Sequence, residues 1–291
     1  MAIKKKKMII ADIFFTISEM FSFDFLVRAF VVGILVSLCA SLLGVSLVMK
    51  RFSMIGDGLS HVGFGALAIA AVMNAAPLLV SIPVVIVAAF LLLRLNENSK
   101  IKGDAAIALV STSSLAIGVV TVSLTTGMNM DVYNFLFGSI LSMSKGDLYL
   151  SVALSIAILT LFFFFYHKLF AITFDETFAK AAGVKTSMYN MLIALLTALT
   201  IVLGMRMMGA LLISSLIIFP ALTSMRIFKR FKTVTISSAI IAVVCFFVGI
   251  VISYLFATPA GASVVIMNIF AFLLFWTIGA FSRKGAQYRQ R

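Results

Sequence analysis

Long apolar segments alternate with short polar connections along almost the whole chain. A helix that crosses a membrane needs about 20 predominantly apolar residues, and eight segments reach that length. They are Phe25–Met49, Pro77–Leu95, Ala105–Thr126, Leu148–Tyr166, Met188–Met205, Met208–Ile227, Val234–Phe256 and Ala262–Phe281. The pattern therefore predicts an all-α integral membrane protein.

Two further segments are less regular. Gly58–Met73 is apolar but short and rich in glycine, so it predicts either a ninth span or an interrupted one. In residues 1–24, a lysine run precedes the stretch Met8–Phe23, which is too polar to predict a span, although a crossing stays open. We expect residues 1–24 to form an interfacial segment, residues 25–282 a transmembrane domain and residues 283–291 a basic cytoplasmic tail.

Composition supports the membrane class and changes how the charge is interpreted. The chain has 291 residues, 63% hydrophobic and 11% charged, with a mean hydropathy of +1.19, which exceeds what a soluble core requires. The formal net charge of +13 could suggest a nucleic-acid partner. However, Lys and Arg gather in connections between the spans, as the positive-inside rule predicts for cytoplasmic loops, so we expect no nucleic-acid partner. These clusters are Lys50-Arg51, Arg94 with Lys100 and Lys102, Lys168–Lys185, Arg226–Lys232 and Arg283–Arg291.

One polar island, Gly56–His61, interrupts the hydrocarbon pattern. Asp57 and His61 are four residues apart, so on a helix they share one face and can present an oxygen and a nitrogen to the same point. Counting helical rise from Lys50-Arg51 places His61 about 15 Å deep. Charged groups at that depth are costly and usually have a task. The pair indicates metal ligands, and the alternative is an Asp–His pair that only joins two helices.

A second polar segment lies between two spans, from Phe174 to Val184. Acids begin it and Gly183 ends it, which is typical of a short helix. With Phe174 and Phe178 as an apolar edge, it is suited to a groove in a soluble partner at the inner membrane face. The alternative is an ordinary solvated loop.

Motifs for catalysis are missing from the chain. No G-x-x-x-x-G-K-S/T sequence occurs, and neither histidine has a nearby nucleophile, so we expect neither ATP hydrolysis nor a bound cofactor. Cys39 and Cys245 lie within apolar segments and indicate packing.

Five stretches, in order, resemble the permease subunits of ABC importers for zinc, manganese and iron ions. They are LLGVSLVMKRFSMIGDGLSHVGFG (Leu42–Gly65), FLFGSILSMSKGDL (Phe135–Leu148), FDETFAKAAGV (Phe174–Val184), MMGALLISSLIIFPA (Met207–Ala221) and TPAGASVVI (Thr258–Ile266). This resemblance implies an ABC importer permease fold similar to the vitamin B12 and metal-chelate class, in the cytoplasmic membrane of a prokaryote. It also implies a homodimer with two ATPase subunits and an extracytoplasmic solute-binding protein.

The resemblance also assigns roles to individual residues. Asp57 and His61 resemble the metal-contacting residues of the translocation path. The segment of about residues 173–184 resembles the coupling helix that contacts the ATPase, and its candidate contact residues are Phe174, Asp175, Glu176, Ala179 and Gly183. Further candidates along the path are Ser60, Asp131, Asn134, Ser214 and Ser215.

Two classes of function remain for this sequence. The first is an importer permease that passes a divalent transition-metal ion inward, zinc ahead of manganese or iron, powered by a separate ATPase chain. The second is an ion-coupled secondary carrier or channel in which Asp57 and His61 bind protons or the driving ion. Dependence on an ATPase subunit separates the two classes.

Overall fold

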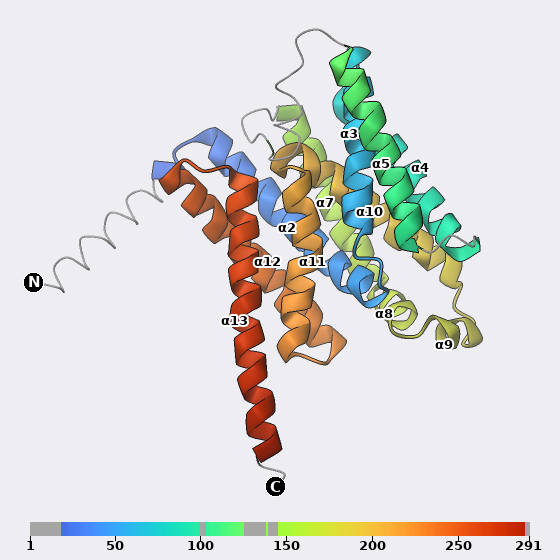
Figure 1. Cartoon of the computed structure of the whole chain (residues 1–291), viewed down its shortest axis with the longest axis vertical. Helices are drawn as coiled ribbons and strands as arrows, with labels where there is room; N and C mark the ends of the chain where they lie inside the picture. The colour runs from blue at the N-terminus through green and yellow to red at the C-terminus, as the bar shows by residue number, and fades with distance from the viewer. Residues whose placement is uncertain (1–18, 99–102, 125–137, 139–144, 289–291) are drawn as a thin grey trace, which may run out of the picture.

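The computed structural model describes residues 19–98, 103–124, 138 and 145–288. Within these ranges the chain forms helices and no strand. Nine of the described helices are long and apolar enough to cross a membrane, which confirms the predicted all-α membrane fold. Figure 1 shows them as α2 (Asp24–Met49), α3 (Ile55–Val72), α4 (Pro77–Asn98), α5 (Gly103–Ser123), α7 (Lys145–Phe164), α10 (Thr186–Met208), α11 (Ala210–Ile227), α12 (Phe231–Phe256) and α13 (Ala260–Tyr288).

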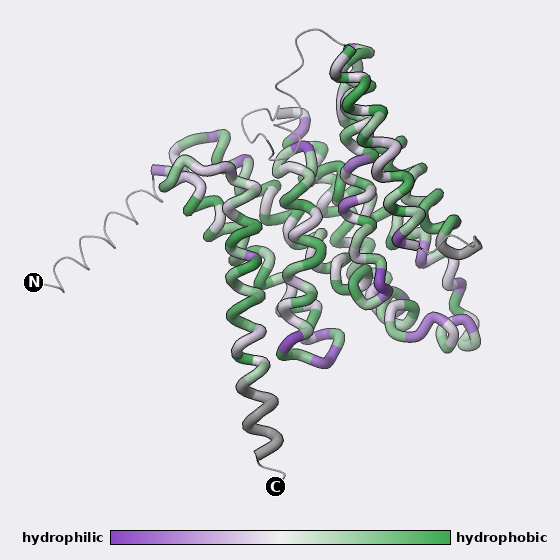
Figure 2. Tube along the Cα trace, in the orientation of Figure 1, coloured by the Kyte–Doolittle hydropathy of each residue, from purple (hydrophilic) through white to green (hydrophobic). Residues whose placement is uncertain are grey.

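The helices divide into a buried centre and an apolar periphery. In α2 and α10, 72% of the apolar window is buried inside the chain, whereas in α5, α7 and α13 only 22% is buried. The exposed side chains of the outer helices are mostly aliphatic or aromatic, and Figure 2 shows polar residues gathered mainly at the connections. Apolar side chains on the outside of a helix bundle are expected where lipid is the solvent.

Helix α3 is unbroken and is long and apolar enough to cross a membrane. The sequence left open whether Gly58–Met73 crosses or is interrupted, and the structure has one continuous helix from Ile55 to Val72. It packs against α4, α5, α10 and α11. The glycines of α3 allow these close contacts, since a Cβ at Gly65 would lie 2.8 Å from the carbonyl oxygen of Ser114 in α5.

The helical count behind the expected depth of His61 does not hold, because residues 50–54 form a turn. The N–H of Phe52 donates to the carbonyl oxygen of Leu47 at 2.8 Å, which folds the chain back on the end of α2. Helix α3 begins only at Ile55, so His61 lies six residues into it, about 9 Å along the axis at helical rise. The Asp57–His61 pair therefore sits nearer to the Lys50 end of α3 than counting from Lys50 indicated.

Two short helices follow α7 where the sequence predicted one helix-like stretch from Phe174 to Val184. Helix α8 (Tyr166–Phe174) ends before Asp175, and α9 (Glu176–Ala181) begins after it. Asp175 has φ −149° and ψ 100°, which is extended backbone. The predicted glycine stop is present, since Gly183 has φ +80° just beyond α9.

Polar connections collect at one end of the bundle. Ring contacts join Tyr166 and Phe170 of α8 to Phe231 at the start of α12, and an ion pair joins α9 to the end of α2. The α2–α3 turn, the α8–α9 segment and the α11–α12 connection therefore lie on the same side (Figure 1). The basic clusters of these connections agree with the predicted inner surface. Residues 1–18 lie outside the described residues, as do residues 289–291 of the tail, so those two assignments stay predictions.

Candidate metal pair and inner-end polar contacts

Asp57 and His61 lie on one face of α3, in its first two turns. The Nε2 atom of His61 is 3.6 Å from Oδ2 of Asp57, which is an ion-pair distance and too long for a good hydrogen bond. The other ring nitrogen of His61, Nδ1, is buried and has no hydrogen-bond partner among the described residues. The side chain of Asp57 is 47% exposed. The pair therefore keeps unused capacity to bind a cation.

An open cavity of about 490 Å³ adjoins the pair. Its walls come from α5 and from the start of α3, and they include Asp104, Ser111 and Thr112 on the α5 side. Among the described residues, no three His, Cys, Asp or Glu side chains lie close enough together to hold a metal ion. Imidazole nitrogen and carboxylate oxygen suit a divalent transition metal. The described residues thus place one oxygen and one nitrogen donor of this kind beside the cavity.

The further candidates along the path differ in their contacts from Asp57 and His61 where the structure describes them. Ser60 is buried and donates to the carbonyl oxygen of Asp57 at 2.7 Å, while Ser214 donates to the carbonyl oxygen of Ala210. The Oγ of Ser215 is buried without a partner among the described residues. Asp131 and Asn134 lie outside the described residues. Ser60 therefore supports the backbone at Asp57, and it does not face the cavity.

The segment of about residues 173–184 has an exposed edge and a side that packs against the rest of the chain. Phe174 is 72% exposed and Phe178 is 71% exposed, so the predicted apolar edge faces outward although the two residues belong to different helices. Asp175 caps α9 by accepting a hydrogen bond from the N–H of Phe178 at 2.9 Å. Ala179 is 1% exposed. The space around Gly183 is open, with no atom within 4 Å of an added Cβ.

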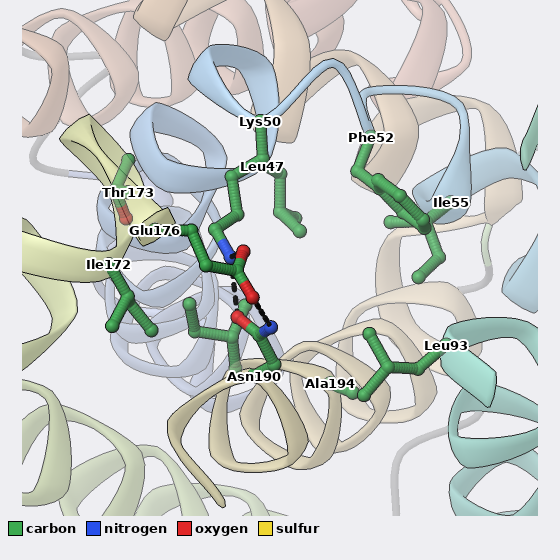
Figure 3. A pocket seen from close by; sticks show the side chains of 11 residues that line it. Leu47, Lys50, Phe52, Ile55, Leu93, Ile172, Thr173, Glu176, Asn190 and Ala194 are labelled. Atoms are coloured by element: carbon green, nitrogen blue, oxygen red, sulfur yellow. Dashed lines mark hydrogen bonds and ion pairs between the residues drawn. The ribbon is translucent and has the colours of Figure 1, made fainter. Parts of the chain in front are cut away.

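Glu176 points into the protein, where it meets two residues that the sequence reasoning did not single out (Figure 3). Lys50 at the end of α2 donates to Oε2 of Glu176 at 2.9 Å and also to Oδ1 of Asn190 in α10. The Nδ2 of Asn190 donates to Oε1 of Glu176 at 2.8 Å. We call Lys50, Glu176 and Asn190 the Lys50 triad. Nothing in the sequence indicated that Lys50, at the end of one span, and Asn190, near the start of another, would both bond to Glu176.

A cavity of about 270 Å³ lies beside the Lys50 triad. Its other walls are mostly apolar and come from α2, the α2–α3 turn, α3, α4, α8 and α10. Among these wall residues are Phe52 and Ile55, which lead into α3 (Figure 3). The triad and the start of α3 therefore border the same space.

Comparison with known proteins finds a family model and sequence relatives that match most of this chain. A model of the ABC 3 transport family matches residues 22–279. The high-affinity zinc uptake system membrane protein ZnuB of Haemophilus influenzae is 31% identical over 253 residues, covering 87% of this chain and 97% of that protein. The manganese transport system membrane protein MntC of Halalkalibacterium halodurans is 26% identical, with 92% of each chain covered.

Solved structures agree with these sequence relatives. The complex of PsaBC from Streptococcus pneumoniae with a Fab contains a chain with a TM-score of 0.81 and 29% identity, over 92% of this chain and 95% of that one. An inward-facing putative metal-chelate type ABC transporter has a TM-score of 0.63 at 15% identity, which shows the shared fold alone. These matches confirm the resemblance to ABC metal-importer permeases and the multi-pass location in the cell membrane. The chain belongs to the ABC 3 transport family.

Proposed function

We propose that this chain is the membrane-spanning subunit of an ABC importer that moves a divalent transition-metal ion into the cell. The observation that carries the proposal is the Asp57–His61 pair, an oxygen and a nitrogen donor held together beside an open cavity in a membrane-spanning helix. Such groups are costly within a membrane unless a partner or a cation compensates them. The ion is cargo, so the chain needs no resident cofactor.

Two copies of the chain complete the site in this proposal. The carboxylate of Asp57 is half exposed, and the described residues of a single chain hold no group of three metal-ligating side chains. A two-fold axis brings the same surface of each copy together, so two Asp57–His61 pairs would offer two oxygens and two nitrogens to one ion. This arrangement uses the homodimer that the sequence resemblance implies.

We place zinc ahead of manganese and iron as the cargo. Mixed imidazole and carboxylate ligands bind zinc more tightly than manganese, following the general order of divalent affinities. The relatives include zinc, manganese and iron transport proteins, so similarity alone does not choose among the metals. Competition between zinc and manganese in an uptake assay decides this point.

The energy and the delivery of the ion come from other chains. We assign ATP hydrolysis to ABC ATPase subunits that bind the exposed edge at Phe174 and Phe178, and delivery to an extracytoplasmic solute-binding protein. Asp175, Ala179 and Gly183 shape the same coupling segment, since they cap, anchor and end α9. Residues 1–24 lie at the interface, and the tail 283–291 lies in the cytoplasm.

Reconstitution into lipid vesicles tests this function. The permease, its ATPase and its binding protein are incorporated together, and uptake of radioactive zinc or manganese is measured with and without ATP. The expected result is uptake that requires both ATP and the ATPase. Uptake driven by a proton or sodium gradient in vesicles that lack the ATPase would instead establish the secondary carrier or channel.

A further inference from the structure

The Lys50 triad joins three elements that have different parts in the proposed function. Lys50 ends α2, Glu176 begins α9 and Asn190 lies in the second turn of α10. Each of the three side chains is hydrogen-bonded to the other two. Because every bond in this closed set crosses from one element to another, none of the three elements can shift without disturbing the others.

The triad is a main attachment of α9 to the bundle. Of the residues in α9, Ala179 alone is buried, so little apolar contact holds this helix in place. Lys50 is shielded, with 17% of its side chain exposed, and Glu176 is 45% exposed. A charge pair that is partly shielded from water holds its two side chains in a defined geometry. Removal of one partner leaves the other charge poorly solvated. Glu176 therefore fixes the position of α9 relative to α2.

A short, stiff connection runs from the triad to the metal pair. Within the turn after Lys50, the N–H of Ile55 donates to the carbonyl oxygen of Phe52 at 3.1 Å, and the N–H of Gly58 donates to that of Met54 at 3.1 Å. Asp57 follows within the first turn of α3. A displacement at Lys50 thus reaches the carboxylate through hydrogen-bonded backbone. The cavity of about 270 Å³ beside this path leaves room for the turn to move.

We propose that Lys50 and Asn190 are positioning residues that transmit movement of α9 to the first turn of α3, and so change the geometry of the Asp57–His61 pair. This inference rests on the function proposed above. Glu176 acts inside the chain as the receiving end of the movement, while Phe174 and Phe178 face the partner. A packed, hydrogen-bonded connection between two sites is a physical route for coupling that a double-mutant cycle can measure.

The test measures ATP hydrolysis and metal uptake in the same vesicles. The variants are Lys50→Met, Glu176→Gln and the exchange Lys50→Glu with Glu176→Lys. In Lys50→Met we expect hydrolysis within about twofold of the unmodified complex but about tenfold fewer ions moved per ATP, the scale of typical coupling losses. Lys50→Arg, which keeps the charge, should recover a large part of the ratio. The exchanged pair should transport better than either single variant.

Arg51→Met is the matched control, because it removes a positive charge from the neighbouring, exposed position and should leave the ratio unchanged. Equal losses of hydrolysis and uptake in Lys50→Met, or a ratio equal to that of the unmodified complex, would overturn the inference. An exchanged pair no better than the single variants would also overturn it. Failure of the proposed function is distinguishable, since the unmodified complex would then show no ATP-dependent uptake.

Discussion

The Asp57–His61 pair and the Lys50 triad lie seven residues apart along the chain at their nearest members, and they differ in how fully their polar atoms are used. In the triad, each side chain is bonded to both of the others. In the pair, the two side chains are 3.6 Å apart and one imidazole nitrogen is buried without a partner among the described residues. Three side chains that all bond to one another are suited to transmit movement. Two side chains with unused nitrogen and oxygen atoms are suited to bind a ligand transiently.

The surroundings of the two groups reinforce this contrast. The pair adjoins an open cavity that is lined mainly by α3 and α5. The triad lies where six helices (α2, α3, α4, α8, α9 and α10) and the α2–α3 turn meet. The difference teaches that one short stretch of sequence, residues 50–61, holds both a fixed contact and an exchangeable one.

The largest expected effect is at the open pair. Asp57→Ala and His61→Ala should each abolish metal uptake, because each removes one of the two donors of the proposed site. Both variants should still insert and still bind the ATPase, since the proposed ATPase contact lies at Phe174 and Phe178 and not at this pair. Asp24→Ala is the control, because Asp24 is a 91% exposed carboxylate at the far end of α2. Normal uptake by either site variant would leave the pair with a structural role only.

The next effect concerns the exposed edge of the coupling segment. Phe178→Asp should weaken ATPase binding strongly, since a buried aromatic anchor at an interface commonly contributes 2 kcal/mol or more by the measure of alanine scanning, and so about thirtyfold or more in affinity. Affinity purification of the permease with its ATPase measures this. Phe256→Asp changes an equally exposed residue at the other end of the bundle and should leave binding intact. Undiminished binding by Phe178→Asp would place the docking surface elsewhere.

Intermediate effects are expected where α3 packs on α5. Gly65→Ala would place a Cβ 2.8 Å from a backbone oxygen of Ser114, and backbone cannot move aside easily. We expect a loss of about 1–3 kcal/mol in stability, measured as a lower thermal unfolding temperature in detergent. Because the metal pair lies on the same helix, uptake should fall as well. Unchanged stability would show that the two helices separate at little cost.

The smallest effect is expected at Gly183. Its φ of +80° is costly for a residue with a Cβ, by about 1 kcal/mol, although no neighbouring atom obstructs the side chain. Gly183→Ala should therefore lower transport slightly, while Gly183→Asn should be milder because asparagine tolerates positive φ. Parallel uptake assays of the two variants measure the difference. Equal loss in both would indicate that bulk at this position matters more than backbone conformation.

Periodicity and spacing anticipated much of this molecule, because they depend on local physics. Apolar runs of span length predicted eight of the nine candidate spans among the described residues and left α3 open, and the spacing of Asp57 and His61 predicted their shared face. The helical count from Lys50 to His61 failed because the turn before Ile55 depends on how α2 and α3 pack, which no local pattern displays.

The contacts within the Lys50 triad could not be predicted from the sequence for a different reason. Lys50 and Glu176 are separated by 126 positions, and they meet only because the fold brings α9 next to the end of α2 and the start of α10. Glu176 was therefore predicted only as a contact for the ATPase, along with Phe174, and its bonds to Lys50 and Asn190 emerged only from the fold. Phe174 and Phe178, whose exposure follows from local apolarity outside a span, were placed on the outer edge as expected.

Metal binding to the purified permease complex, measured by equilibrium dialysis with radioactive zinc, tests the central claim most directly. The account predicts one ion for two permease chains, lost in His61→Ala and retained in Lys50→Met, because the pair binds the ion and the triad only transmits movement. Binding that survives His61→Ala, or that disappears in Lys50→Met, would contradict this division between the two groups.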